Sequence, residues 1–428
     1  MILNHFPDRW FIRSALVAVV IPFMPHAAAS DLLAHSSEKP LSVSAALATA
    51  LTTHPLIASR QGDYQATKGE LSAARWARFP AFVASARSAA DGEDQTSAVV
   101  SQPLWSAGRL SGQIDVAIAR SGMALADIED ARQIVLTDTA SAFIDLYRAQ
   151  QKAVIATSNV KEHQRLYQII QRRVAAATSP DVDAMLAEAR LSFSKSQQLQ
   201  FESASAIART QLEQLVGAEV TAIRAPKTPA MTDQTLAQIE YAALAYSPQL
   251  QQLKSQSAGL EANLKVAKSA LYPQLSLNYE RKFGELLFAQ EREQIYLTVD
   301  FQPGAGLSAR SSIAAAGARK RAAQSTIDAT RRDVRRQVQI AWRERQAALL
   351  QLAPSKRLVT ATAEVVESYL RQYTVGRKSW LDVLNAQREA VQAEYTLVEY
   401  ETLLLMASYQ LQILSGDVSA LVGDPISG

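Results

Sequence analysis

Apolar residues recur at spacings of three, four and seven along two very long stretches of the chain, about 110–177 and 308–375. Such spacing places them on one helix face and is typical of a coiled-coil seam. Helices of that length would be roughly 100 Å long at 1.5 Å per residue. Two helices of nearly 40 residues, about 181–217 and 380–415, are expected to lead the chain back. The seam positions include Ile128, Ala131, Val135, Ala142, Leu146, Val334, Val338, Ala341, Ala348 and Leu352.

A second pattern, with period two, precedes each long stretch. Residues 275–283 and 295–301 alternate between apolar and polar side chains, which predicts a pair of strands with one apolar face. The corresponding segments of the first half, about 81–89 and 95–104, alternate more weakly, and only the internal repeat identifies them as strands. A helix is expected from about residue 41 to 79, because Pro80 cannot continue it.

The sequence contains two internal repeats. Pro55 and Pro248 are 193 residues apart, as are Pro80 and Pro273, and Gly217 and Gly416 are 199 residues apart. A fixed period of this kind indicates internal repeats. The expected organisation is a first repeat at 30–217 with strands within 81–104, a linker at 218–240, a second repeat at 241–416 with strands within 274–302, and a tail at 417–428. The fold class is therefore mainly α with a small β part.

Composition limits where such a chain acts. Residues 1–29 combine two arginines, a short apolar run broken by Pro22 and the small residues Ala27 to Ala29, which predicts a secretory signal peptide rather than a membrane-spanning helix. The absence of Cys excludes disulfides, thiolate sites and a lipid-accepting Cys near the N-terminus. A formal charge of +3 is too small to indicate nucleic acid as a partner.

The four strands cannot close a barrel within one chain. Each is about ten residues long, the length that a tilted strand needs to cross a bilayer. Open sheet edges are not tolerated in lipid, so several chains would have to pool their strands in a membrane. The alternative is a small sheet that caps a soluble coiled coil.

Two motifs, SPDVDAMLAEARL at 179–191 and VGRKSWLDVLNAQRE at 375–389, lead to a family resemblance. With the signal peptide and the duplicated helix and strand order, the chain resembles the TolC family of outer-membrane export ducts over nearly its whole mature length. The resemblance implies a homotrimer with a twelve-stranded β-barrel in the outer-membrane lipid and a coiled-coil α-helical barrel across the periplasm. It also implies a passive pore that works with a periplasmic adaptor and an inner-membrane ABC exporter or proton-driven pump.

The resemblance assigns a pore constriction to the start of the last long helix. Asp382 would contribute to a ring of three carboxylates, and Asn385 stands where many such channels carry a second acid, which puts strong cation selectivity in doubt. Local chemistry offers another role, because Ser379 and Asp382 form the pattern of a capping box. Both interpretations remain open at this stage.

The resemblance also assigns a gate latch and an adaptor contact. The latch would consist of Asp183, Tyr373 and Lys378, with a phenol and an ammonium on one hairpin hydrogen-bonded to a carboxylate on another. The turn at 375–377 (Val375, Gly376 and Arg377) resembles the turn that receives an adaptor hairpin. Ala176 and Ala177 occupy the same place in the first half without Gly, which weakens that expectation there.

Two rival classes are less well supported. An enzyme is not expected, because the three histidines after the signal peptide, His35, His54 and His163, lie in no catalytic motif, and no metal, cofactor or catalytic site is predicted. A periplasmic coiled-coil scaffold or adaptor would be expected to carry other β modules. Within the export-duct interpretation, the motif SWLDVLNAQRE resembles members that serve type I secretion of large adhesins, and small-molecule efflux is the alternative.

Overall fold

The computed structural model describes residues 40–88, 94–231, 234–283 and 292–422. The predicted signal peptide at 1–29 and the last part of the expected tail lie outside the described residues. Residues from Pro40 onward form one compact unit by themselves. The mainly helical fold with a small four-stranded part is confirmed.

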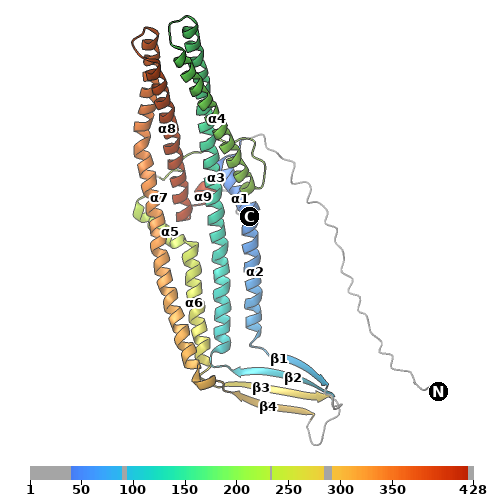
Figure 1. Cartoon of the computed structure of the whole chain (residues 1–428). Helices are drawn as coiled ribbons and strands as arrows, with labels where there is room; N and C mark the ends of the chain where they lie inside the picture. The colour runs from blue at the N-terminus through green and yellow to red at the C-terminus, as the bar shows by residue number, and fades with distance from the viewer. Residues whose placement is uncertain (1–39, 89–93, 232–233, 284–291, 423–428) are drawn as a thin grey trace, which may run out of the picture. The chain divides into compact units, whose positions relative to one another are not determined.

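The elements follow the same order in both halves of the chain (Figure 1). Helices of 11, 22, 67 and 36 residues in the first half have counterparts of 11, 22, 66 and 36 in the second. The first half contains α1 (Val43–Thr53), α2 (Pro55–Trp76), β1 (Ala81–Ser88), β2 (Asp94–Trp105), α3 (Arg109–Ala175) and α4 (Asp181–Val216). The second contains α5 (Leu236–Tyr246), α6 (Pro248–Ser269), β3 (Gln274–Phe283), β4 (Glu293–Asp300), the 3-10 turn η1 (Ala305–Leu307), α7 (Ala309–Thr374), α8 (Trp380–Ser415) and the short α9 (Ser419–Val422).

The single helix expected from about 41 to 79 is wrong, because the structure has two helices there. His54 adopts an extended conformation, ends α1, and caps α2 by accepting a hydrogen bond from the backbone N–H of Leu56. Pro55 is the first residue of α2, a position where its missing N–H costs nothing. Ser247 and Pro248 make the same break between α5 and α6.

The long helices form one layer, in which each helix contacts specific neighbours. Between the sheet and the middle of the layer, α2, α3, α6 and α7 follow one another, and beyond the middle the order is α4, α3, α8 and α7. α3 and α7 therefore run the full length, while α6 and α8 share the space between them. The largest apolar core lies near the middle and joins the two halves, with Phe143 and Leu146 of α3, Leu212 of α4 and Ile413 of α8.

The four strands form one antiparallel sheet at the ends of α2, α3, α6 and α7 (Figure 1). The order is β1-β2-β3-β4, so β1 and β4 are its edges. The registers place Phe82, Val100 and Tyr279 in one row, and Leu275 opposite Val299 on the same face. The other face is mainly polar, with Asn278 donating to Thr298 and the Ser85 and Ser97 hydroxyls 2.8 Å apart, although Val83 of β1 and Val99 of β2 also lie on it. The predicted separation into an apolar and a polar face is confirmed.

Exposure distinguishes this sheet from one that caps a soluble protein. Its apolar face is largely uncovered: Phe82, Ile295, Leu297 and Val299 each expose more than half of their surface. Among the described residues, no helix has the length and apolarity needed to cross a membrane. Within the described chain, the apolar face of the sheet thus lacks a partner.

Candidate functional site

The two helical hairpins end in turns with the same backbone. In the α3–α4 turn the N–H of Thr178 donates to the carbonyl of Arg173 (2.9 Å), and in the α7–α8 turn the N–H of Arg377 donates to Gln372 (2.9 Å). Both turns contain one left-handed residue, Gly376 with φ 76° and Ala177 with φ 52°. A side chain in this conformation costs about 1–2 kcal/mol. The missing Gly therefore does not alter the first turn, although Ala177 carries a steric cost that Gly376 avoids.

The capping box predicted at the start of α8 is present. Oδ2 of Asp382 accepts from the backbone N–H (3.0 Å) and the hydroxyl (2.8 Å) of Ser379, while Ser379 Oγ accepts from the N–H of Asp382 (3.2 Å). These hydrogen bonds, helped by nearby Lys378, hold the pKa of Asp382 below its usual range. Within the described residues only Oδ2 is engaged, so the carboxylate can cap the helix and still present a charged oxygen to solvent.

Trp380 is the centre of an apolar cluster that joins the hairpins. Its side chain is 2% exposed and packs with Tyr373, their ring centroids 5.2 Å apart. Leu166 and Ile170 of α3 belong to the same cluster. The indole Nε1 is buried and has no hydrogen-bond partner among the described residues. Trp380 thus contributes to the tip through packing.

None of the three predicted latch residues forms a hydrogen bond or ion pair with another within the described part of one chain. The hydroxyl of Tyr373 lies 3.2 Å from that of Ser179, in the turn of the other hairpin, and the guanidinium of Arg173 stacks 4.8 Å from the Tyr373 ring centre. Lys378 lies over the ring of Tyr369, 4.3 Å from its centre. Asp183 lies in the first turn of α4, and within the described part of the chain it contacts neither Tyr373 nor Lys378 through a hydrogen bond or ion pair. The latch therefore stays a prediction, for contacts between copies of the chain.

An exposed polar stripe runs along α8 from the tip. Asp382 and Asn385 lie three residues apart and share a face, and Glu389 and Gln392 continue it at helical spacing. Val383, Leu384, Ala386 and Gln387 between them are buried. Glu389 was not among the predicted residues, although its spacing of seven from Asp382 could have indicated it.

Polar contacts connect the two hairpins between the tip and the middle of the layer. The amide of Gln387 donates to Asn159 (3.3 Å), and both side chains are buried. Closer to the middle, Lys152 pairs with Glu399 on α8. The interface between the hairpins therefore alternates between the apolar tip cluster, this polar segment and the central core.

The predicted adaptor turn is open to solvent. Val375 is 68% exposed, and Gly376 and Arg377 are exposed beside it. On the other hairpin, Val182 and Met185 in the first turns of α4 expose 64% and 69% of their surface. The tips therefore carry apolar side chains that nothing in the described chain covers.

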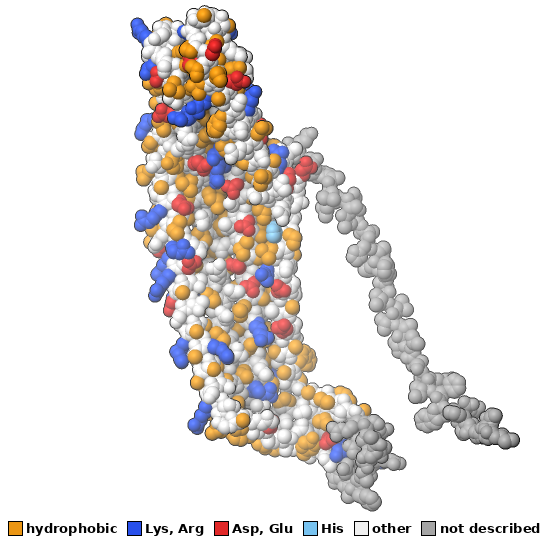
Figure 2. Space-filling view, in the orientation of Figure 1, with side chains coloured by type: hydrophobic (Ala, Val, Ile, Leu, Met, Phe, Trp, Pro, Cys, Tyr) orange, Lys and Arg blue, Asp and Glu red, His pale blue; other side chains and the backbone are white. Residues whose placement is uncertain are grey.

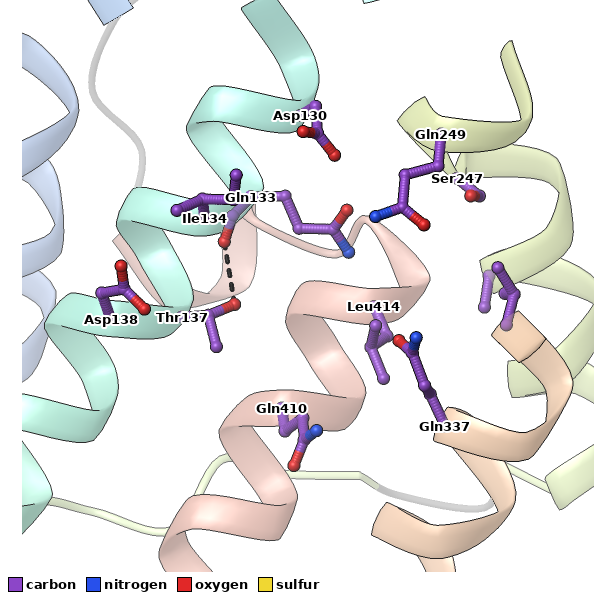
Figure 3. A pocket seen from close by; sticks show the side chains of 12 residues that line it. Asp130, Gln133, Ile134, Thr137, Asp138, Ser247, Gln249, Gln337, Gln410 and Leu414 are labelled. Carbon is purple, nitrogen blue, oxygen red and sulfur yellow. Dashed lines mark hydrogen bonds between the residues drawn. The ribbon is translucent and has the colours of Figure 1, made fainter. Parts of the chain in front are cut away.

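A polar pocket of about 230 Å³ lies where α8 ends and α6 begins, between α3 and α7 (Figure 3). Asp130 and Gln133 of α3 and Gln249 of α6 point toward one another across it. Burial, and then the neighbouring Asp127, raise the pKa of Asp130. The lining combines amides and hydroxyls with two carboxylates and four apolar side chains, and the described residues contain no group of His, Cys, Asp and Glu that could hold a metal ion. We interpret the pocket as the space left where the end of α8 meets the start of α6.

Comparison with known proteins identifies the family. The family described as "Outer membrane efflux protein" matches residues 46–218 and again residues 240–417, and so covers most of the chain in two consecutive segments. This chain belongs to the outer membrane efflux protein family. The TolC-like resemblance inferred from the sequence is confirmed at this level, while the type I secretion subtype is not tested.

Several individual proteins are similar to this member of the outer membrane efflux family. The outer membrane efflux protein BepC of Brucella suis is 21% identical over 299 residues, which cover 69% of this chain and 66% of BepC, just under two thirds of its length. The CmeC outer membrane channel of Campylobacter jejuni superposes with a TM-score of 0.76 at 15% identity, covering 92% of this chain and 93% of CmeC. VceC of Vibrio cholerae gives a TM-score of 0.74 at 16% identity, covering 89% of this chain and 96% of VceC. At these identities the structural likeness establishes the shared fold.

Proposed function

We propose that three copies of this chain form the outer-membrane exit duct of a three-part export system. The observation that carries the proposal is the four-stranded sheet, whose apolar face is exposed and whose edge strands β1 and β4 each leave one side unpaired within the described chain. Pairing β4 of one copy with β1 of the next would close twelve strands into a barrel, which removes every open edge. The apolar face would then meet lipid, and the polar face would line the channel.

The helical layer supports the same assembly. Its outer helices beyond the middle, α4 and α7, expose large apolar side chains along their length. On α4 these include Phe193, Leu199 and Ile207, and on α7 they include Leu350 and Leu358. Side-by-side packing of α7 against α4 of the next copy would bury both rows and continue the layer into a closed helical barrel.

The assembly can be tested on protein extracted from membranes. We expect a detergent-dependent particle with the mass of three chains and a conductive pore in planar bilayers. A particle that stays monodisperse and monomeric in buffer without detergent would instead support a periplasmic scaffold or adaptor. Residues 1–29 are expected to be absent from the mature protein, which N-terminal sequencing would check.

The tips would form the gate of this duct. Asp382 is proposed to form the ring that narrows the pore, with Asn385 on the next turn. The exposed stripe on α8 adds Glu389, a second acid that would compensate in part for the neutral Asn385. The latch of Asp183, Tyr373 and Lys378 is proposed to act between hairpins. Each such hydrogen bond contributes on the order of 1 kcal/mol net, so a partner protein can break a few of them.

Conductance tests the latch directly. We expect the combination of Tyr373→Phe and Lys378→Ser to raise the conductance of the closed pore. Asp183→Asn should have a similar effect if its carboxylate pairs across copies in the trimer. If all three changes leave the pore as closed as the wild type, the latch assignment is wrong and the packing around Trp380 alone would have to hold the tips together.

The partners follow from the duct proposal. Val375, Gly376 and Arg377 are proposed to contact a periplasmic adaptor, and an inner-membrane ABC exporter or proton-driven pump would supply the energy that a passive pore lacks. Cysteine crosslinking from Val375→Cys to an adaptor hairpin would test the contact. Equal crosslinking from Val154→Cys, an exposed position on α3 away from the tip, would argue against it.

For cargo we favour proteins, since the motif SWLDVLNAQRE resembles that of type I secretion members. Small-molecule efflux is the second candidate, supported by the efflux description of the family and of BepC. A deletion strain distinguishes them. Loss of a large secreted protein with unchanged drug susceptibility supports the first, and raised drug susceptibility with an unchanged set of secreted proteins supports the second.

A further inference from the structure

Glycines mark the place where α3 and α6 approach each other closely. A methyl group at Gly122 would lie 3.0 Å from the hydroxyl of Ser255, and one at Gly112 would lie 2.7 Å from a side chain of α6. Because Gly is a poor helix former, its presence inside a helix calls for a packing reason of this kind. The contacting pairs are Gly112 with Ala262, Gly122 with Ser255, and Ala119 with Gly259.

Two further glycines, Gly62 and Gly69, stand inside α2 without such a reason in one chain. Both are exposed, and a methyl group at either would meet no atom outside α2 within 4 Å in the described chain. The internal repeat relates them to the close contact, because the residues 193 positions later are Ser255 and Ala262 of α6. The face of α2 that corresponds to the contact face of α6 is therefore uncovered.

The internal repeat also relates the contacts between helices. Ile57 of α2 and Val135 of α3 belong to one apolar cluster. Their counterparts, Leu250 of α6 and Val334 of α7, belong to another. Beside α7, α6 thus takes the place that α2 takes beside α3. The opposite side of α3 is covered by α6, so the equivalent side of α7 is the one that lacks a neighbour in one chain.

This free side of α7 carries the counterparts of the two α3 glycines. A spacing of 199 relates Val135 to Val334, and the same spacing relates Gly112 to Ser311 and Gly122 to Arg321. Ser311 and Arg321 are both exposed. Figure 2 shows Lys and Arg side chains along the left edge of the helical layer, where α7 runs, with no other described element beyond them. The two outer helices of the layer therefore each present an uncovered contact face.

The sheet would bring these two faces together in the proposed duct. α2 leads into the edge strand β1, and the edge strand β4 leads into α7. Pairing β4 with β1 of the next copy therefore places α7 beside α2 of that copy. The free face of α2 has a second copy of this chain as its natural occupant.

We propose that α2 and α7 of neighbouring copies pack against each other as α6 and α3 do within one chain, with Gly62 making room for Arg321 and Gly69 for Ser311. The two partners exchange sizes, because Ser255 faces Gly122 within the chain, whereas Gly62 would face Arg321 between copies. A close contact needs one small partner, and the repeat keeps one on either side. This inference rests on the proposed duct and names the residues that join its copies between the sheet and the middle of the layer.

Disulfide crosslinking tests the contact in a chain without Cys. Ala66 and Ala318 are the counterparts of Gly259 and Ala119, whose β-carbon positions would be 3.1 Å apart, close to the spacing of about 3.5–4.5 Å in disulfides. The variant with Ala66→Cys and Ala318→Cys should give covalent trimers on denaturing gels after mild oxidation of the purified particle. Ser59→Cys with Ala318→Cys is the matched control and should give none, because Ser59 lies about two turns from Ala66 on α2.

The outcomes separate this packing from the duct itself. A trimer that gives no crosslink with Ala66→Cys and Ala318→Cys would overturn the packing and leave the duct intact. Equal crosslinking of both Cys pairs would also overturn it, since the two helices would then have no fixed alignment. A monomeric particle without crosslinks would overturn both the packing and the duct.

Larger side chains at the glycines have effects of opposite sign on a covered and a free face. Gly62→Leu with Gly69→Leu should lower the temperature at which the trimer dissociates, because Leu leaves no room for α7 of the next copy. On a free face the same variant should be at least as stable as wild type, since Leu is a better helix former than Gly. That result would overturn the proposal. Gln61→Leu with Lys68→Leu, at exposed positions one residue earlier, is the matched control and should leave dissociation unchanged.

The exchange of sizes provides a rescue variant. Gly62→Ser alone should lower the dissociation temperature of the trimer. Adding Arg321→Gly should recover part of the loss, because the pair then equals Ser255 with Gly122. If the effects of Gly62→Ser and Arg321→Gly simply add, the two residues do not contact each other and the proposed packing is wrong.

Discussion

Replacing Trp380 with Ala should loosen the tips more than any other single change there. The side chain is 2% exposed. A buried Trp removes about 150–250 Å² from water, which at about 25 cal/mol per Å² corresponds to about 4–6 kcal/mol. Measured truncations of buried Phe and Trp to Ala cost about 3–5 kcal/mol. We therefore expect a loss in this range for the closed arrangement of each chain.

Only part of this lost free energy favours opening of the tips. Trp380 packs both against its own hairpin, through Tyr373 and Val383, and against Leu166 and Ile170 of the other hairpin. If about half of the packing crosses between hairpins, roughly 2 kcal/mol per chain would favour separation, which is a shift of about 30-fold in the ratio of open to closed tips. Within one chain, Tyr373→Phe removes the contact with Ser179 and leaves the ring packing in place, so it should shift the ratio less, by about 0.5–1.5 kcal/mol.

Single-channel recording of the purified trimer measures this ratio. Trp380→Ala should raise the open probability strongly, and Trp380→Phe should raise it much less, because Phe keeps most of the packing and the lost Nε1 has no hydrogen-bond partner among the described residues. Trp342→Ala, on α7 and outside the tip cluster, is the matched control and should leave gating unchanged. A folded trimer of Trp380→Ala with wild-type closure would refute the argument that this cluster holds the hairpins together.

Three further changes have defined outcomes. Asp382→Asn should reduce cation over anion permeability in reversal potentials across a salt gradient, and adding Glu389→Gln should reduce it again; an unchanged second step would remove Glu389 from the pore. Ala177→Gly should raise the free energy of unfolding by about 1 kcal/mol, because it removes the steric cost of a left-handed Ala. Gly376→Ala should lower it by a similar amount. Equal melting temperatures of both variants and wild type would contradict the turn geometry. Burial is the largest cause that lowers the pKa of His163 below its usual 6.5. The stability that the neutral ring provides is therefore complete above pH 6.5 and decreases as the pH falls toward the lowered pKa. A His163→Gln variant should not show this decrease when melting is measured against pH.

The fold was predictable because its signals are local and repeated. The ends of α3, α4, α7 and α8 lie within about two residues of their expected positions, where glycines and turn residues interrupt a long heptad pattern. The strands of the first half gave a weak signal, since β1 is built from Ala and Ser as much as from Phe82 and Val83. The break at His54 and Pro55 was missed, although Pro is common at the first position of a helix and could have indicated the start of α2.

The site was predictable only where its geometry is local. The capping box of Ser379 and Asp382 follows from a spacing of three on one helix. The contact between Tyr373 and Ser179 joins residues 194 positions apart, and the packing of Trp380 against α3 is equally remote in sequence. No single-sequence pattern encodes such pairs. Glu389 is different, because the heptad spacing from Asp382 was visible and only the exposure of its face was unknown.

The turns of the two hairpins have the same backbone conformation but different side chains. Both turns have equivalent backbone hydrogen bonds and a left-handed residue at the same position. Yet the second turn has Gly376 at that residue and a complete capping box, where the first has Ala177 and Pro180 without a side-chain cap. Trp380 has Asp181 as its counterpart, 199 positions earlier. Because the duplicated fold is satisfied by either set of residues, the specialised set in α7 and α8 supports the proposal that the second hairpin lines and closes the pore.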